Sequence, residues 1–130
     1  MVNRISSFRD LEVYKKAFAL QQEIFELTES SPKEELYSLT DQMRRASRSI
    51  GSNIAEAWQK QRYIQHFVSK LSDSDGEQAE TQHWLDTALA CGYITRDERD
   101  LLVKSCQEIG RMLGSMMTNP EPFCRRFKKR

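Results

Sequence analysis

Residues 44–57, with the sequence RRASRSIGSNIAEA, contain the side chains of this protein best suited to chemistry. Arginine binds phosphate and carboxylate groups equally well through its paired N–H donors. Two interpretations of Arg44, Arg45 and Arg48 therefore stay open, namely phosphate binding and ion pairs within or between subunits. Small residues surround these arginines, and Gly51 costs about 1 kcal/mol relative to alanine inside a helix. This composition indicates a close helix–helix seam with a polar layer.

Metal and nucleophilic chemistry have weaker support in the sequence. Di-iron bundles need two Glu-x-x-His motifs and two further inward glutamates. Glu80 and His83 form one such motif, but Tyr63 stands where the glutamate before His66 would be needed. Neither a Gly-x-Ser-x-Gly elbow nor a glycine-rich phosphate loop occurs. We therefore expect no enzymatic activity, no catalytic residue, no bound metal and no cofactor, and a metal-binding bundle is the least favoured alternative.

The end of the sequence, CRRFKKR, is strongly basic. Chain ends are usually mobile, so this segment is interpreted either as a solvated terminus or as an electrostatic arm for RNA or DNA. Its aromatic residues, Phe123 and Phe127, could stack on bases or dock on a neighbouring surface. The basic residues of this tail are Arg125, Arg126, Lys128, Lys129 and Arg130.

Apolar residues recur at intervals of three and four along most of the chain, which predicts amphipathic helices. We expect four of them, at about 9–29, 36–60, 64–91 and 96–117. Pro32 follows the first, Gly92 is placed to cap the third, and Thr95 with Glu98 forms a capping-box pattern before the fourth. The predicted fold is all-α, an up-down-up-down antiparallel four-helix bundle over residues 1–118, followed by a mobile basic tail over 119–130.

The second and third predicted helices carry opposite charge. Residues 39–70 have a net charge of +4, and residues 71–89 have a net charge of −5. If these helices form an antiparallel hairpin that turns near residues 60–63, positions whose numbers sum to about 123 face each other. Arg48 then lies opposite Asp75, and Arg45 lies near Glu77 and Glu80. The two charged blocks are therefore expected to be close together.

Composition limits the class of protein further. The 130 residues suit a single domain, and the net charge of +1 does not by itself point to nucleic acid. No apolar run approaches the 20 or so residues of a membrane span, and the N-terminus lacks the features of a secretory signal. Three widely spaced cysteines do not form a disulfide framework. We expect a cytoplasmic protein that does not associate with membranes.

Three segments resemble the 23S ribosomal RNA intervening-sequence protein family: FRDLEVYKKA, PKEELYSLTDQMRRASRSIGSNIAEAW and AETQHWLDTALACGYI. The resemblance extends from about Phe8 to Met117, and its most specific part is Gln42 to Glu56. It implies a four-helix bundle that assembles as a ring-like homopentamer. Related proteins, the accessory variability determinants of diversity-generating retroelements, are strongly basic pentamers that bind nucleic acid and a reverse transcriptase. This chain is almost neutral, and Gly51 replaces a proline that is common in the family.

The resemblance and the charge pattern together give two sets of candidate residues. Candidates for the polar seam or the oligomer contact are Arg44, Arg45, Ser49, Ser52, Asn53, Glu56, Glu80 and Gln82. Candidates for nucleic-acid contact are Arg44, Arg45, Arg48, Arg125, Arg126, Lys128, Lys129 and Arg130. We expect a non-enzymatic scaffold or adaptor that binds copies of itself, with binding of structured RNA or DNA through a basic rim or tail as the alternative.

Overall fold

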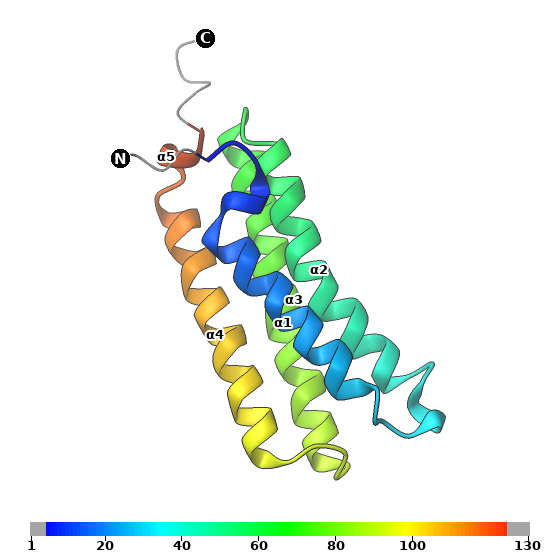
Figure 1. Ribbon diagram of the computed structural model, residues 1–130. Coiled ribbons are helices and arrows are strands. Elements are labelled where there is room, and N and C mark those ends of the chain that lie inside the picture. The colour runs from blue at the N-terminus through cyan, green and yellow to red at the C-terminus, as the bar shows by residue number, and fades with distance from the viewer. Residues whose placement is uncertain (1–4, 125–130) are drawn as a thin grey trace.

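A computed structural model describes residues 5–124 and shows four long helices packed side by side (Figure 1). They are α1 (Glu12–Thr28), α2 (Leu39–Gln59), α3 (Ile64–Ala90) and α4 (Arg96–Thr118). Consecutive helices run in opposite directions, and no strand occurs among the described residues. The predicted all-α bundle is confirmed. None of the helices in this range is long and apolar enough to cross a membrane.

Short helical turns change the predicted helix bounds. The 3-10 turn η1 (Phe8–Asp10) precedes α1, and a second turn, η2 (Lys33–Glu35), separates α1 from α2. The carboxylate of Glu35 accepts hydrogen bonds from the Ser38 hydroxyl at 2.6 Å and from the Leu39 N–H at 3.3 Å. Helix α2 therefore begins at Leu39 rather than at residue 36. Leu36, which its spacing placed in the core, is 44% exposed.

The connection between α3 and α4 follows the predicted capping chemistry. Gly92 has a φ of +78°, and the N–H of Tyr93 donates to the Ala88 carbonyl at 2.9 Å. A glycine in this left-handed conformation closes the end of α3 without strain. The hydroxyl of Thr95 accepts from the Glu98 N–H at 3.1 Å, and the Glu98 carboxylate accepts from the Thr95 N–H at 2.8 Å. Both predicted caps are confirmed.

The core contains a polar layer within its apolar stripes. Ser74 and Thr81 of α3 are completely buried between Leu71 and Leu85. Each hydroxyl has a hydrogen-bond partner, since Ser74 donates to a carbonyl of α2 and Thr81 donates to the carbonyl of Glu77 in its own helix at 2.8 Å. Burial of these groups is therefore tolerated. Ala79 fits the spacing of the apolar positions of α3, but it is exposed.

The beginning of the predicted tail is packed on the bundle. A short helix, α5 (Glu121–Cys124), follows α4, and the Phe123 ring stacks on Phe67 of α3 with centroids 5.9 Å apart. Cys124 is buried. The predicted tail therefore begins with a short helix whose Phe123 packs beside α3. The five basic tail residues lie outside the described residues.

Candidate functional site

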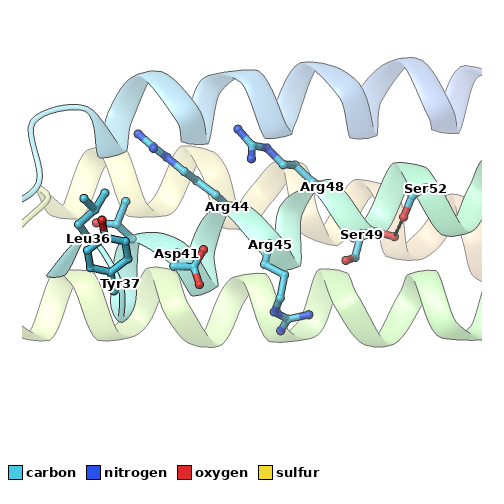
Figure 2. Close-up of a pocket in the computed structure, with 9 residues that line it drawn as sticks. Leu36, Tyr37, Asp41, Arg44, Arg45, Arg48, Ser49 and Ser52 are labelled. Carbon is cyan, nitrogen blue, oxygen red and sulfur yellow. Dashed lines mark hydrogen bonds between the residues drawn. The ribbon is translucent and has the colours of Figure 1, made fainter.

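A groove with a volume of about 550 Å³ runs along the outer face of α2 (Figure 2). The first residues of the groove come from the α1–α2 connection, and the others recur every three or four positions along α2. This spacing places them on one side of the helix. The residues that line the groove are Leu36, Tyr37, Thr40, Asp41, Arg44, Arg45, Arg48, Ser49 and Ser52.

Arg44 points from α2 toward the end of α1 (Figure 2). Its Nε donates to the Thr28 hydroxyl at 2.8 Å, and its Nη2 lies 3.4 Å from the Phe25 carbonyl oxygen. The guanidinium carbon also lies 4.5 Å from the centre of the Phe25 ring, within range of a cation–π contact. Arg44 therefore satisfies polar groups at the end of α1, and these two contacts use two of its five N–H groups.

Arg45 points in the opposite direction, toward α3 (Figure 2). Its Nη2 forms a close ion pair with Glu80, and its Nη1 lies 3.9 Å from Glu77. Glu80 also accepts a hydrogen bond from the Trp84 indole at 3.0 Å. The predicted proximity of Arg45 to Glu77 and Glu80 is confirmed. Arg45 therefore links α2 to α3, and Glu80 is held by this contact rather than by a partnership with the exposed His83.

Glu77 is the least satisfied carboxylate of this ion-pair cluster. Its Oε1 is buried and has no hydrogen-bond partner, because the 3.9 Å separation from Arg45 is too long for one. Burial raises the pKa of Glu77, the negative charge of Glu80 raises it further, and Arg45 offsets only part of this increase. The charged form of Glu77 is therefore disfavoured in the fold relative to an exposed glutamate.

Arg48 does not face the acidic helix, and the prediction that it lies opposite Asp75 is wrong. Its guanidinium carbon lies 5.9 Å from the Phe25 ring of α1, on the same side of α2 as Arg44. Asp75 instead accepts a hydrogen bond from Gln78 at 2.9 Å. The cause is the helical turn, since residues three positions apart point in directions that differ by about 60°. Arg48 remains exposed and has no ion pair among the described residues.

The predicted seam lies inside the protomer, between α2 and both neighbouring helices. The Ser74 hydroxyl donates to the Ile50 carbonyl at 2.9 Å, which brings α3 close to α2. On the other side, a methyl group added to Gly51 would lie 3.5 Å from the Tyr14 ring of α1. The sequence analysis did not identify Ser74. Its spacing from the apolar residues of α3 could have predicted its burial, although the residues next to it are acidic.

The remaining polar candidates bind mainly to their own helices or across the α2–α3 contact. Asn53 donates to the Ser49 carbonyl at 2.8 Å, and the Ser52 hydroxyl donates to the same oxygen at 3.3 Å. Glu56 pairs with Lys70 at 2.8 Å, and this contact lowers the pKa of the Glu56 carboxyl. Ser52 itself is exposed, so it does not form part of the seam within the protomer.

Gln82 and the tail candidates complete the comparison with the sequence-based expectations. Gln82 donates to the Gln78 side chain at 2.8 Å on α3, without contacting the groove. The groove adds Leu36, Tyr37, Thr40 and Asp41, which the sequence did not single out. Tyr37 and Leu36 lie in the connection before α2, where the apolar spacing that includes Leu36 does not indicate burial. The tail candidates lie outside the described residues.

Comparisons with known proteins place this geometry in a family. A family model described as 23S rRNA-intervening sequence protein matches residues 9–115. A crystal structure at 1.70 Å resolution, of a protein with unknown function from the S23 ribosomal protein family of Bacteroides thetaiotaomicron VPI-5482, is similar to this chain. The sequence identity is 30% and the TM-score is 0.76, over 82% of this chain and 96% of that chain. A search of curated proteins gives no match.

Proposed function

The chain belongs to the 23S rRNA-intervening sequence protein family, and from this premise we propose that it is a non-enzymatic, homo-oligomeric scaffold or adaptor of the cytoplasm. Five subunits is the number that the family resemblance implies. The proposal rests chiefly on one observation, which is that large apolar side chains are exposed where the groove on α2 begins. There Tyr37 is 90% exposed and Leu36 is 44% exposed.

The lining of the groove favours contact with another protein surface. Ser49 and Ser52 are small, so a neighbouring helix can approach α2 closely along the groove. Leu36 and Tyr37 would lose their water-exposed apolar surface in such a contact, which stabilises association by about 25 cal/mol per Å². Because the other apolar faces of α2 are already covered by α1 and α3, this outer face is the one that a second copy can still reach.

The same lining gives little support to catalysis. Among the described residues of the groove, Asp41 is the only carboxylate, while Arg44 and Arg45 are bound to other groups of the chain. The Ser52 hydroxyl donates to a carbonyl of its own helix and has no neighbouring base to activate it. These contacts are consistent with a structural role for the polar side chains of residues 44–56.

The oligomer is tested with a bulky substitution at an exposed position of the groove. Light scattering at micromolar concentration should give several subunits for the intact protein and one for Ser52→Trp. The matched control is Ser72→Trp, which changes an exposed serine on α3 and should leave the assembly unchanged. A monomeric intact protein would refute the proposal. Assembly that survives Ser52→Trp would place the subunit contact elsewhere.

Binding of RNA or DNA is the second candidate function. It is favoured by the positions of the cations, because Arg44 and Arg45 have internal partners whereas Arg48 has no ion pair among the described residues. Phosphate binding would therefore use Arg48 or the basic tail. Labelled RNA hairpins and DNA duplexes at about 50 and 200 mM salt provide the test, since phosphate-driven binding weakens steeply over this range. No binding at the lower salt would exclude this function.

A further inference from the structure

A second pocket adjoins the groove where α1 ends and α2 begins. Its volume is about 330 Å³, and its lining comes from the last residues of α1, the α1–α2 connection and the first turns of α2. Leu36, Thr40 and Arg44 line both the pocket and the groove, so the two meet at these side chains. A pocket of this size is suited to a small ligand.

Thr40 brings to this pocket a hydroxyl group that the fold itself does not use. The residue is only 3% exposed, but its hydroxyl has no hydrogen-bond partner among the described residues. The buried hydroxyls of Ser74 and Thr81 in the core each have such a partner. Buried polar groups are normally hydrogen-bonded, and a group in the wall of a pocket can find its partner in a ligand.

Arg44 brings charge and further donors to the same place. Its guanidinium group is held by the Thr28 hydroxyl and the Phe25 carbonyl, and these contacts leave three of its five N–H groups for a ligand. A side chain that is already fixed loses little freedom when it binds an anion. Thr40 and Arg44 are four positions apart in α2 and therefore lie on the same face of the helix.

The lining of the pocket carries an excess of positive charge. It contains Lys33 and Arg44 but only one carboxylate, that of Glu29. Arg48 points from α2 to the same side as Arg44 (Figure 2). Glu35 lies outside the lining, and its carboxylate accepts three hydrogen bonds from other groups of the chain. Because α1 ends and α2 begins here, the two helix dipoles oppose each other, and the side chains determine the sign of the charge.

From this arrangement we propose that the pocket binds the anionic group of a small organic acid, either a carboxylate or a phosphate ester. Arg44 and the Thr40 hydroxyl donate to the oxygens of the anion, since the planar fork of arginine fits both kinds of group. The apolar part of the ligand packs on Phe25 and Leu36, which also line the pocket. The site is independent of the proposed subunit contact at Ser52, which lies outside the pocket.

The experiment measures binding of three probes to the full chain by saturation-transfer NMR of the probe protons. Benzoate and phenyl phosphate carry the two kinds of anion on one ring, and benzyl alcohol is their neutral counterpart. At least one of the two acids should bind with a Kd below about 10 mM, a modest affinity for a molecule of this size. Benzyl alcohol should bind about tenfold more weakly or not at all, because it offers no charge to Arg44. The acid that binds more tightly identifies the class of ligand.

Two variants test the donors. Thr40→Val keeps the branched shape of the side chain and removes its hydroxyl. It should weaken binding of the acid about tenfold without lowering the free energy of unfolding, because the hydroxyl has no partner in the fold to lose. Arg44→Lys keeps the charge but loses the fork, and it should weaken binding to a similar degree. Lys104→Gln, at an exposed position of α4 outside the pocket, is the control and should leave binding unchanged.

Binding of an acid that Thr40→Val and Arg44→Lys both weaken, with Lys104→Gln normal, supports the site. Unchanged binding in the first two variants overturns it. Equal binding of benzyl alcohol also overturns it, since the pocket would then not select anions. Binding that appears only in Ser52→Trp would show that a neighbouring subunit fills the pocket, which overturns the assignment to a small molecule but supports the oligomer. If neither the intact protein nor Ser52→Trp binds any probe, the pocket is not a binding site.

Discussion

Four glycines inside the long helices allow the packing to be tested one methyl group at a time. They are Gly51 in α2, Gly76 in α3, and Gly110 and Gly114 in α4, and none of them has a positive φ. Replacing such a glycine by alanine stabilises a helix interior by about 1 kcal/mol, because alanine has less conformational freedom to lose on folding. The measured effect is then this gain minus the cost of placing the new methyl group.

The surroundings of each glycine determine that cost. A methyl group at Gly76 or Gly114 would meet no atom within 4 Å, so the full gain of about 1 kcal/mol is expected. At Gly51 it would make an ordinary contact at 3.5 Å with the Tyr14 ring, and a similar gain follows. At Gly110 it would lie 2.9 Å from Nε2 of Gln78, which donates to Asp75. Displacing this bond costs about 1 kcal/mol, which cancels the gain.

Urea unfolding followed by circular dichroism at 222 nm measures these differences at one fixed protein concentration. Gly76→Ala and Gly114→Ala should each raise the free energy of unfolding by about 1 kcal/mol, or the melting temperature by about 4 °C. Gly110→Ala should leave both nearly unchanged. Light scattering on each variant excludes an effect that arises from altered assembly. Equal stabilisation at Gly110 and Gly114 would refute the reasoning, since it would show that the Gln78 contact carries no energy.

Three further substitutions test the core, the polar layer and the buried carboxylate. Ile54→Asp should unfold the bundle, because it buries an unpaired charge at a fully buried position, and circular dichroism would detect the lost helix. Ser74→Ala should lower the free energy of unfolding by about 1 kcal/mol in urea through loss of the bond to Ile50, and an unchanged value would mean that this bond contributes nothing. Glu77→Gln should stabilise the protein at pH 7. The pKa of Glu77 is raised above its ordinary 4.5, so the folded state holds this proton more tightly than the unfolded chain does. As pH rises and the carboxyl loses its proton, the charged carboxylate therefore disfavours folding. The advantage of Glu77→Gln in urea unfolding should vanish below pH 4.5, and a pH-independent difference would contradict this account.

Local chemistry accounts for the features that the sequence predicted correctly. The apolar period of each helix, the glycine at position 92 and the Thr95–Glu98 cap each depend on residues within one or two turns. The contact of Arg45 with Glu80 also follows, because a short turn fixes the register of an antiparallel helix pair. These features need no knowledge of the rest of the fold.

Features that depend on tertiary packing could not be derived in the same way. Arg48 points about 60° away from Arg45 on α2, and that α1 lies on this side of the helix depends on the packing of the bundle, which hydropathy does not encode. Ser74 is buried within an acidic run because α3 approaches the Ile50 carbonyl at that point. Phe123 packs on Phe67 although the basic residues that follow it in sequence are typical of a solvated tail. The groove itself depends on the η2 turn, which moves the start of α2 and leaves Tyr37 uncovered.

A closed ring would give the two proposals one joint consequence. Cyclic symmetry orients every subunit in the same direction, so the nucleic-acid contacts of all copies would gather on one rim. A long single strand could then contact several copies at once. After its first contact, each further contact is intramolecular and has a high effective concentration, which a strand that fills only one site cannot exploit. If Ser52→Trp gives monomers, it should bind a 15-nucleotide strand with the affinity of the intact protein, counted per site. It should bind a 75-nucleotide strand at least about 100-fold more weakly than the intact ring does. Equal affinity of ring and monomer for the long strand would show that the copies do not present their nucleic-acid contacts together, and a shared rim would be refuted even if each subunit binds a short strand.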